Sequence, residues 1–151
     1  MMDAQDALHA VAAEARRSPG ARLVTISTID VDQDQMIRVY STDPESYPVG
    51  GREEPLREGD DDPWHDRVVL QQQPWVSFDV DHLRANFADY ELIESLGCGA
   101  IINVPIVHEG AAIGSINLLD AEGRYDQSSV DAAVLLGARI VPILVSLKRH
   151  H

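Results

Sequence analysis

The run AIINVPIV at residues 100–107, the short segment HEGA at 108–111 and the run AIGSINLL at 112–119 predict two strands joined in an antiparallel hairpin. Both runs are rich in β-branched residues, which favour extended backbone. The connecting segment is short and polar, and it contains the glycine that a tight turn needs. We therefore expect an antiparallel sheet around this hairpin.

Three further segments have the composition of strands, and they lie at residues 22–30, 36–42 and 75–80. The first two are separated by a polar connector of hairpin length, so we expect them to pair with each other. The irregular segment 43–66, which contains four prolines and three glycines, separates them from the third strand. The strand count is therefore about five to six.

Three segments are predicted to be helices. Leu8, Val11 and Ala15 recur at helical spacing within residues 3–17. Asp81 is the predicted N-cap of a second helix that ends at Gly97. A third helix is predicted at residues 128–148 and is apolar around most of its circumference, so it needs cover on more than one side. Helices together with an antiparallel sheet make an α+β fold.

Composition excludes several classes of protein. The chain has 151 residues, which fits a single domain over residues 1–151, and its net charge is −13. Lys148 is the only lysine, so no basic surface is expected for nucleic acid or for an anionic membrane. No apolar run is expected to cross a membrane, and the N-terminal segment lacks the charge pattern of a secretory signal. We expect a cytoplasmic protein.

The hairpin resembles the central hairpin of a GAF domain, in which a strand ending in V-P-I is followed by a glycine turn and a strand reading I-G-x-I/L-x-L. Here these positions are Val104-Pro105-Ile106, Gly110 and Ile113-Gly114-Ser115-Ile116-Asn117-Leu118. The resemblance implies a PAS-like sensor fold, with the N- and C-terminal helices on one face of the sheet. Loops and short helices would form a ligand pocket on the other face. Many such domains form homodimers through their terminal helices.

Three known functions of this family find no support in the motifs. The N-K-x(n)-F-x-x-x-D-E pattern of cyclic-nucleotide binding is missing, and so is the Cys-His pair of bilin attachment. Reductases of free methionine sulfoxide use several cysteines, whereas Cys98 is the only one here. A thiol-dependent reductase centred on Cys98 is the enzymatic alternative, and a buried, inert thiol is the other interpretation of this residue.

The candidate pocket residues are polar or aromatic side chains on or just before the predicted strands, on the second helix and in the acidic segment 43–66, which carries −7 of the net charge. They are Trp64, His65, Trp75, Ser77, Tyr90, Cys98, Asn103 and Asn117. Trp64 could fold over the pocket or serve as a hydrophobic plug. Ser115 raises the same question as Asn103 and Asn117, because polar side chains facing a pocket need partners.

Asp60, Asp61 and Asp62 are a weak candidate for a metal site, and a solvated acidic loop is the favoured interpretation of them. No catalytic set and no cofactor can be assigned. We expect a stand-alone GAF-type module that binds a small molecule, with a polar or cationic ligand favoured by the acidity. A ligand-free interaction module is the remaining alternative. His150 and His151 are either native or the remnant of a tag.

Overall fold

The protein is described by a computed structural model that covers residues 3–149, and the predictions for His150 and His151 lie outside this part. Its centre is a six-stranded antiparallel sheet with strand order β3-β2-β1-β6-β5-β4. The strands are β1 (Leu23–Asp30), β2 (Gln35–Ser41), β3 (Arg52–Glu53), β4 (Trp75–Ser77), β5 (Ala100–His108) and β6 (Ala111–Asp120). The α+β prediction is confirmed, and β3 is a strand that the sequence did not reveal.

The hairpin β5–β6 forms as expected, with Glu109 and Gly110 both at positive φ (51° and 80°) in its two-residue turn. Asn103 pairs with Asn117 and Ile101 pairs with Leu119, so polar residues face each other across the two strands and apolar residues do the same. Because β1 pairs with the other edge of β6, the hairpin becomes the middle of the sheet. The register of this pair shifts once between Ile106 and Val107, so the turn and this irregularity together set the pairing of the central strands.

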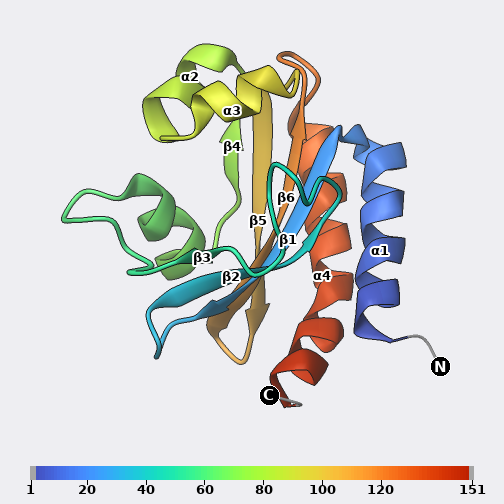
Figure 1. Cartoon of the computed structure of the whole chain (residues 1–151), viewed down its shortest axis with the longest axis vertical. Coiled ribbons are helices and arrows are strands. Elements are labelled where there is room, and N and C mark those ends of the chain that lie inside the picture. The colour runs from blue at the N-terminus through green and yellow to red at the C-terminus, as the bar shows by residue number, and fades with distance from the viewer. Residues whose placement is uncertain (1–2, 150–151) are drawn as a thin grey trace.

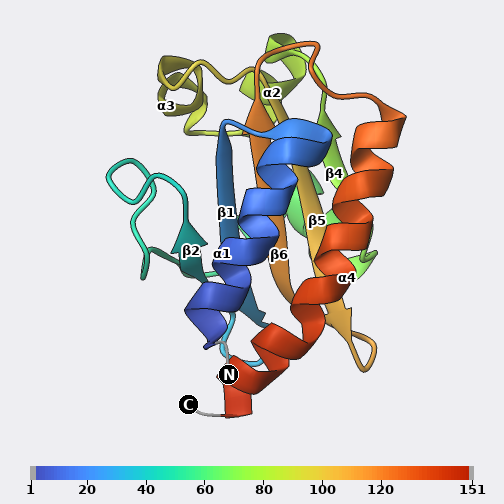
Figure 2. The ribbon, with the colours of Figure 1, turned by 90° about the vertical axis from the view of Figure 1, so that its right-hand side faces the viewer.

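Two long helices cover one face of the sheet, as Figures 1 and 2 show: α1 (Ala4–Ala15) and α4 (Gln127–Arg149). We call this side the helical face, and its strand residues are Val24, Ile26, Ile102, Val104, Ile106, Ile116 and Leu118. These side chains alternate along each strand with those of the opposite side, because successive residues of a strand point to opposite faces. Burial on the helical face gives the protein its main core.

The helix α4 contradicts one expectation from the sequence. Its segment Gln127–Lys148 is long and apolar enough, by length and composition, to meet the criteria for a membrane span. In the fold this helix lies on the sheet, where Ile140 and Leu144 are almost completely buried. Its apolar residues therefore have a structural role in the core, although Val134 and Leu135 remain exposed.

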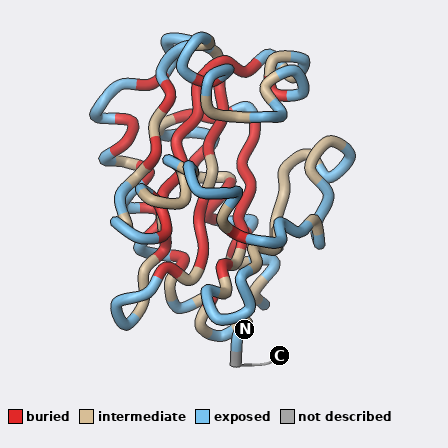
Figure 3. Tube along the Cα trace, turned by 90° about the vertical axis from the view of Figure 1, so that its left-hand side faces the viewer, coloured by how far each residue is buried: buried red, intermediate tan, exposed pale blue. Residues whose placement is uncertain are grey.

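The opposite side of the sheet carries the segment 43–64, the short helical segment η2 (His65–Leu70), α2 (Val80–Asn86) and α3 (Tyr90–Ser95). We call it the cavity face. Figure 3, which looks onto this side, shows buried central strands surrounded by exposed loops. Its strand residues are Leu23, Thr25, Ser27, Ile101, Asn103, Ser115, Asn117 and Leu119.

The region 75–97 departs from the prediction in two ways. The strand β4 stops at Ser77, because Asp79 accepts a hydrogen bond from the His82 amide (2.8 Å) and caps a helix that begins at Val80. Asp81 is therefore not the N-cap. The single predicted helix is divided into α2 and α3, because Phe87 adopts an extended conformation between them. Gly97, at φ 80°, ends α3 as expected.

Candidate functional site

A cavity of about 360 Å³ opens on the cavity face of the sheet. The strands β1, β5 and β6 form its floor, and its walls come from β2 and β3, from the loops around them and from the segment between α2 and α3. A cavity of this size is sufficient for a small metabolite. The site is therefore built by segments that are far apart in the sequence.

The floor carries a row of hydrogen-bonded polar side chains that crosses three strands. Asn103 donates from Nδ2 to Asn117 Oδ1 (2.7 Å), and Asn117 donates from Nδ2 to Thr25 Oγ1 (3.1 Å). Trp64 donates its indole N–H to Asn103 Oδ1 (3.0 Å). This chain of bonds fixes the orientation of both amides and holds the Trp64 ring against the cavity.

Two polar side-chain atoms of cavity-lining residues are buried without a hydrogen-bond partner. They are Ser115 Oγ on the floor and Arg38 Nε on β2, and within residues 3–149 they are the two buried side-chain polar atoms in this state. Ser115 has an exposed fraction of 0%. A buried polar group normally finds a partner, since leaving it unpaired costs about 1–3 kcal/mol. Both exceptions thus coincide with one cavity.

The wall next to Arg38 contains an aromatic contact. The Arg38 guanidinium carbon lies 5.0 Å from the centroid of the Tyr47 ring, and Arg38 Nη1 donates to the Pro48 carbonyl (3.0 Å). Tyr47 donates its hydroxyl proton to Asp89 Oδ2 (2.7 Å). Burial raises the pKa of Tyr47, and the hydrogen bond to Asp89 raises it further. The phenol therefore stays neutral and ties the loop after β2 to the loop between α2 and α3.

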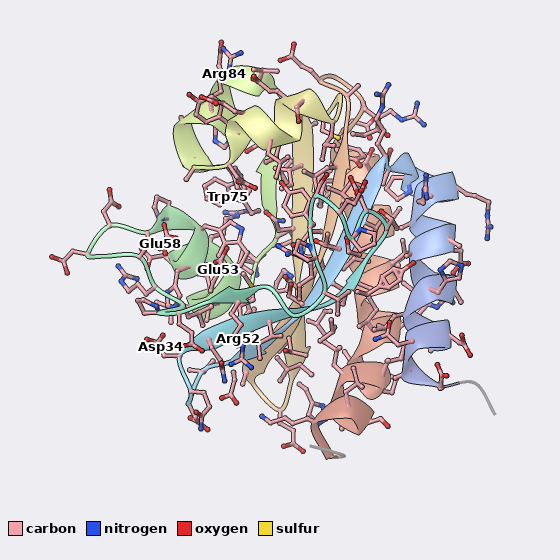
Figure 4. The ribbon with its side chains drawn as sticks, in the orientation of Figure 1. Asp34, Arg52, Glu53, Glu58, Trp75 and Arg84 are labelled. Carbon is pink, nitrogen blue, oxygen red and sulfur yellow. The ribbon has the colours of Figure 1, made fainter. Side chains whose placement is uncertain are left out.

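Acidic side chains predominate among the charged residues of the cavity lining. Four carboxylates, those of Glu53, Glu58, Asp62 and Asp89, accompany the single guanidinium of Arg38. Figure 4 shows Glu53 and Glu58 on the side of the sheet away from α1 and α4. Partial desolvation raises the pKa of the Glu53 carboxyl, and the negative charges of Glu58, Asp89 and Asp62 add to this effect. The cavity consequently carries an excess of negative charge.

The structure places the eight predicted pocket residues in different surroundings. Trp64, Asn103 and Asn117 line the cavity, whereas His65, Trp75, Ser77, Tyr90 and Cys98 are not part of its lining. Trp75 and Tyr90 pack in a neighbouring apolar cluster beneath α2 and α3. His65 lies next to Arg57, whose Nη1 is 3.4 Å from His65 Nδ1.

Ser77 and Trp75 form a separate contact network with His82. Trp75 donates its indole N–H to Ser77 Oγ (3.1 Å), and Ser77 Oγ lies 2.7 Å from His82 Nδ1. The imidazole stacks on the indole with 5.7 Å between the ring centroids. Because Trp75 and His82 engage the Ser77 hydroxyl and Ser77 does not line the cavity, this hydroxyl serves the network and not the cavity.

Cys98 is also withdrawn from solvent, with 4% of its surface exposed. Burial raises the pKa of its thiol to about 11, with a smaller contribution from Asp120, while Arg22 opposes the shift. The thiolate is the nucleophilic form, so this environment disfavours reactivity.

The side chains of Asp60, Asp61 and Asp62 do not come together at one site. Asp62 lines the cavity, but its two carboxylate oxygens accept the backbone amides of His65 (3.0 Å) and Glu58 (2.9 Å). Asp60 and Asp61 are exposed and lie outside the lining. Residues 3–149 contain no group of three His, Cys, Asp or Glu side chains arranged to hold a metal ion.

Several lining residues were not among those predicted from the sequence. Thr25 and Ser27 could have been found, because they alternate with Val24 and Ile26 along a strand. The same alternation places Arg38 between Ile37 and Val39, and Phe87 follows the apolar spacing of the predicted second helix. No periodic signal marks the others, which come from irregular segments or from the sheet edge: Tyr47, Glu53, Glu58 and Asp89.

The fold has clear counterparts among solved structures. The GAF domain of a two-component sensor histidine kinase from Bacillus halodurans has a TM-score of 0.77 at 9% identity, with 99% of both chains covered. The GAF domain of a phosphoenolpyruvate-protein phosphotransferase from Coxiella burnetii gives 0.79 at 16%, covering 99% of this chain and 87% of that one. The type II free methionine-R-sulfoxide reductase of Thermoplasma acidophilum gives 0.66 at 14%, covering 95% and 93%.

These likenesses, all below a quarter identity, establish the fold alone. No curated protein matches the sequence. The GAF domain model, however, matches residues 1–144. This match covers nearly the whole chain, including the hairpin β5–β6 and the strands that build the cavity floor. The chain therefore belongs to the GAF domain family.

Proposed function

We propose that this chain is a cytoplasmic sensing module that binds a small polar molecule in the cavity and carries no catalytic activity of its own. The observation that supports this proposal best is the coincidence of two unpartnered buried atoms, Ser115 Oγ and Arg38 Nε, on the wall of one cavity. Bulk water does not contact either atom, so a ligand that binds against Ser115 and Arg38 with hydrogen-bonding groups would supply the missing partners.

Trp64 connects the cavity floor to the surface segment, so ligand binding at the floor could change the conformation of that segment. Its indole N–H is bonded to the floor at Asn103, while its backbone belongs to the segment that leads into η2. A ligand that competes for Asn103 would release the Trp64 ring. The acidic segment before it would then move, which is a change that a partner protein can detect.

A ligand screen by thermal shift tests the proposal when two serine variants are compared. Ser115→Ala removes a hydroxyl from the cavity floor, whereas Ser77→Ala removes an equally buried hydroxyl outside the cavity lining. A true ligand stabilises the parent and Ser77→Ala alike and stabilises Ser115→Ala less. A protein that purifies without a bound small molecule, and that no library member stabilises, contradicts the proposal and favours a ligand-free interaction module.

We also propose that two copies associate through their terminal helices. The exposed surface of α4 includes Leu135, with 72% of its surface accessible, and Val134, with 42%. Large apolar side chains at these positions favour contact with a second apolar surface. Analytical ultracentrifugation of the parent and of Leu135→Glu checks this, since a dimer should dissociate in the variant and a monomeric parent would contradict it.

The enzymatic alternative is a reductase, like the free methionine-R-sulfoxide reductase of Thermoplasma acidophilum, whose fold is similar. Cys98 is the residue on which it would depend, because the chain has one cysteine. Its thiol is buried, its pKa is raised to about 11 and it is not part of the cavity lining. A single thiol also has no second thiol in the chain to resolve an oxidised intermediate. These observations favour the sensing function.

A further inference from the structure

The charges of the cavity lining are only partly balanced by contacts within the protein. Asp62 accepts two backbone amides and Asp89 accepts the Tyr47 hydroxyl, so both carboxylates have partners. Glu53 and Glu58 differ from them: both residues are exposed to solvent, and in the described part of the chain neither carboxylate makes a hydrogen bond or an ion pair with the protein. Two negative groups without partners thus lie at the mouth of the same cavity.

The one cation in the lining, Arg38, lowers the pKa of Glu53 but does not cancel the upward shift. The Arg38 guanidinium is engaged with the Tyr47 ring and with the Pro48 carbonyl, and it forms no ion pair within residues 3–149. Repulsion from Glu58, Asp89 and Asp62 contributes to the raised pKa of Glu53. Like charges held close together favour a bound cation that relieves the repulsion.

A second and independent observation points to a ligand at this place. Ser115, at the bottom of the cavity, is fully buried and its hydroxyl has no partner. Ser115 is one of the residues on the floor of the same cavity that Glu53 and Glu58 line. The carboxylates at the mouth and the hydroxyl on the floor therefore define two ends of one binding site.

We propose that the cavity binds a small organic amine, with its ammonium group between Glu53 and Glu58 and a hydrogen-bonding group of its body at Ser115. This assignment rests on the proposed sensing function and specifies the ligand class. The aromatic side chains Tyr47, Trp64 and Phe87 line the same cavity and offer apolar and cation–π contacts to the body and the charged end of the ligand.

Other ligand classes fit less well. A bare divalent cation needs several oxygen ligands from one cluster, and residues 3–149 contain no such group. A phosphate-bearing or dicarboxylate ligand would meet four carboxylates against one guanidinium. A small organic monocation lowers the repulsion among the carboxylates, and the rest of the molecule can carry a polar group that bonds to the floor.

The test compares ligands that share a skeleton and differ in charge: tyramine as the cation, tyrosol as the neutral form, tyrosine as the zwitterion and phloretic acid as the anion. Leucinol provides an aliphatic amine. The chain contains two tryptophans, so a ¹⁵N-labelled sample gives two indole N–H resonances in an NMR spectrum. Trp64 reports on the cavity and Trp75, bonded to Ser77 elsewhere, is the internal control.

We expect an amine to shift the Trp64 resonance and leave that of Trp75 in place, with tyramine binding about fivefold more tightly than tyrosol. Glu53→Gln combined with Glu58→Gln should reduce tyramine affinity to that of tyrosol without changing tyrosol. Glu54→Gln is the matched control, because this neighbour is not part of the cavity lining.

Two outcomes overturn the inference. If tyrosol or phloretic acid shifts Trp64 at least as strongly as tyramine, and the double variant binds tyramine unchanged, the ammonium assignment is wrong while the proposed sensing function stands. If neither amine moves the Trp64 resonance, the cavity does not take this ligand class. The co-purification experiment and the serine pair then decide the sensing function separately.

Discussion

Replacing Ser115 by alanine should stabilise the ligand-free protein, although most substitutions of buried residues destabilise a fold. The Ser115 hydroxyl is fully buried and unpartnered, so the folded state bears a desolvation cost of about 1–3 kcal/mol that the unfolded state avoids. Alanine removes this cost and leaves only a small void on a wall that already faces a cavity. We expect the free energy of unfolding to rise by about 1 kcal/mol.

Thr25→Val is the matched control on the neighbouring strand. The Thr25 hydroxyl accepts a hydrogen bond from Asn117 Nδ2 (3.1 Å), and valine has nearly the same shape without this acceptor. The substitution should destabilise the protein by about 1 kcal/mol, because the Asn117 amide loses its shorter hydrogen bond and keeps only the 3.5 Å contact with the Thr25 carbonyl oxygen. Two hydroxyl deletions on one floor are thus expected to have opposite signs.

Urea denaturation of the parent and both variants measures these differences, provided that the m-value stays constant. For a chain of this length, a gain of about 1 kcal/mol corresponds to a rise in Tm of about 2–4 °C. If Ser115→Ala destabilises the protein as much as Thr25→Val does, the Ser115 hydroxyl is satisfied in the folded state. The main argument for a ligand at this wall would then be refuted.

Gly114→Ala should destabilise the fold by about 2–3 kcal/mol in urea denaturation, because the new methyl carbon would lie 2.5 Å from the Ser27 carbonyl oxygen, a backbone atom in the middle of the sheet; a near-neutral result would show that β1 and β6 can separate. Cys98 should react with iodoacetamide at about pH 7 roughly a hundredfold more slowly than an ordinary cysteine, because its pKa is about 11 instead of 9.0; rapid labelling in intact-mass spectra of the folded protein argues against the buried thiol. Glu53 has a raised pKa, so its ionised form destabilises the fold as the pH rises above its ordinary value of 4.5. Glu53→Gln should therefore have a higher Tm than the parent near neutral pH and lose this advantage in acid, and a constant difference across the pH range would contradict the shift.

The fold could be predicted from local patterns because each pattern reports on a short-range property. Alternating apolar residues with a Glu-Gly turn predicted the hairpin β5–β6, and this pattern depends only on strand periodicity and turn geometry. The division between α2 and α3 was missed for the opposite reason. Apolar spacing continues through Phe87, but its backbone is extended and its ring packs against Trp75, which is distant in sequence, with 6.3 Å between the ring centroids.

The candidate site shows a similar limit. Asn103 and Asn117 could be proposed from the sequence, because polar residues within apolar strands stand out. Tyr47, Glu53 and Glu58 could not, since all three lie in the irregular segment 43–66 and none follows a periodic pattern. Their position depends on contacts between distant residues. The buried side chain of Leu56, whose amide donates to the Asp34 carbonyl (3.1 Å), anchors the segment, and Tyr47 bonds to Asp89.

By itself, the sequence determined the α+β class, the central hairpin, the acidity of residues 43–66 and the family resemblance, because composition and periodicity are properties of short stretches. Only the tertiary structure decided which of the acidic side chains face a cavity and which polar atoms remain unpaired there. It also decided that Cys98 lies outside the cavity lining. These are properties of contacts across the sheet, and a partner many residues away leaves no mark on the local sequence.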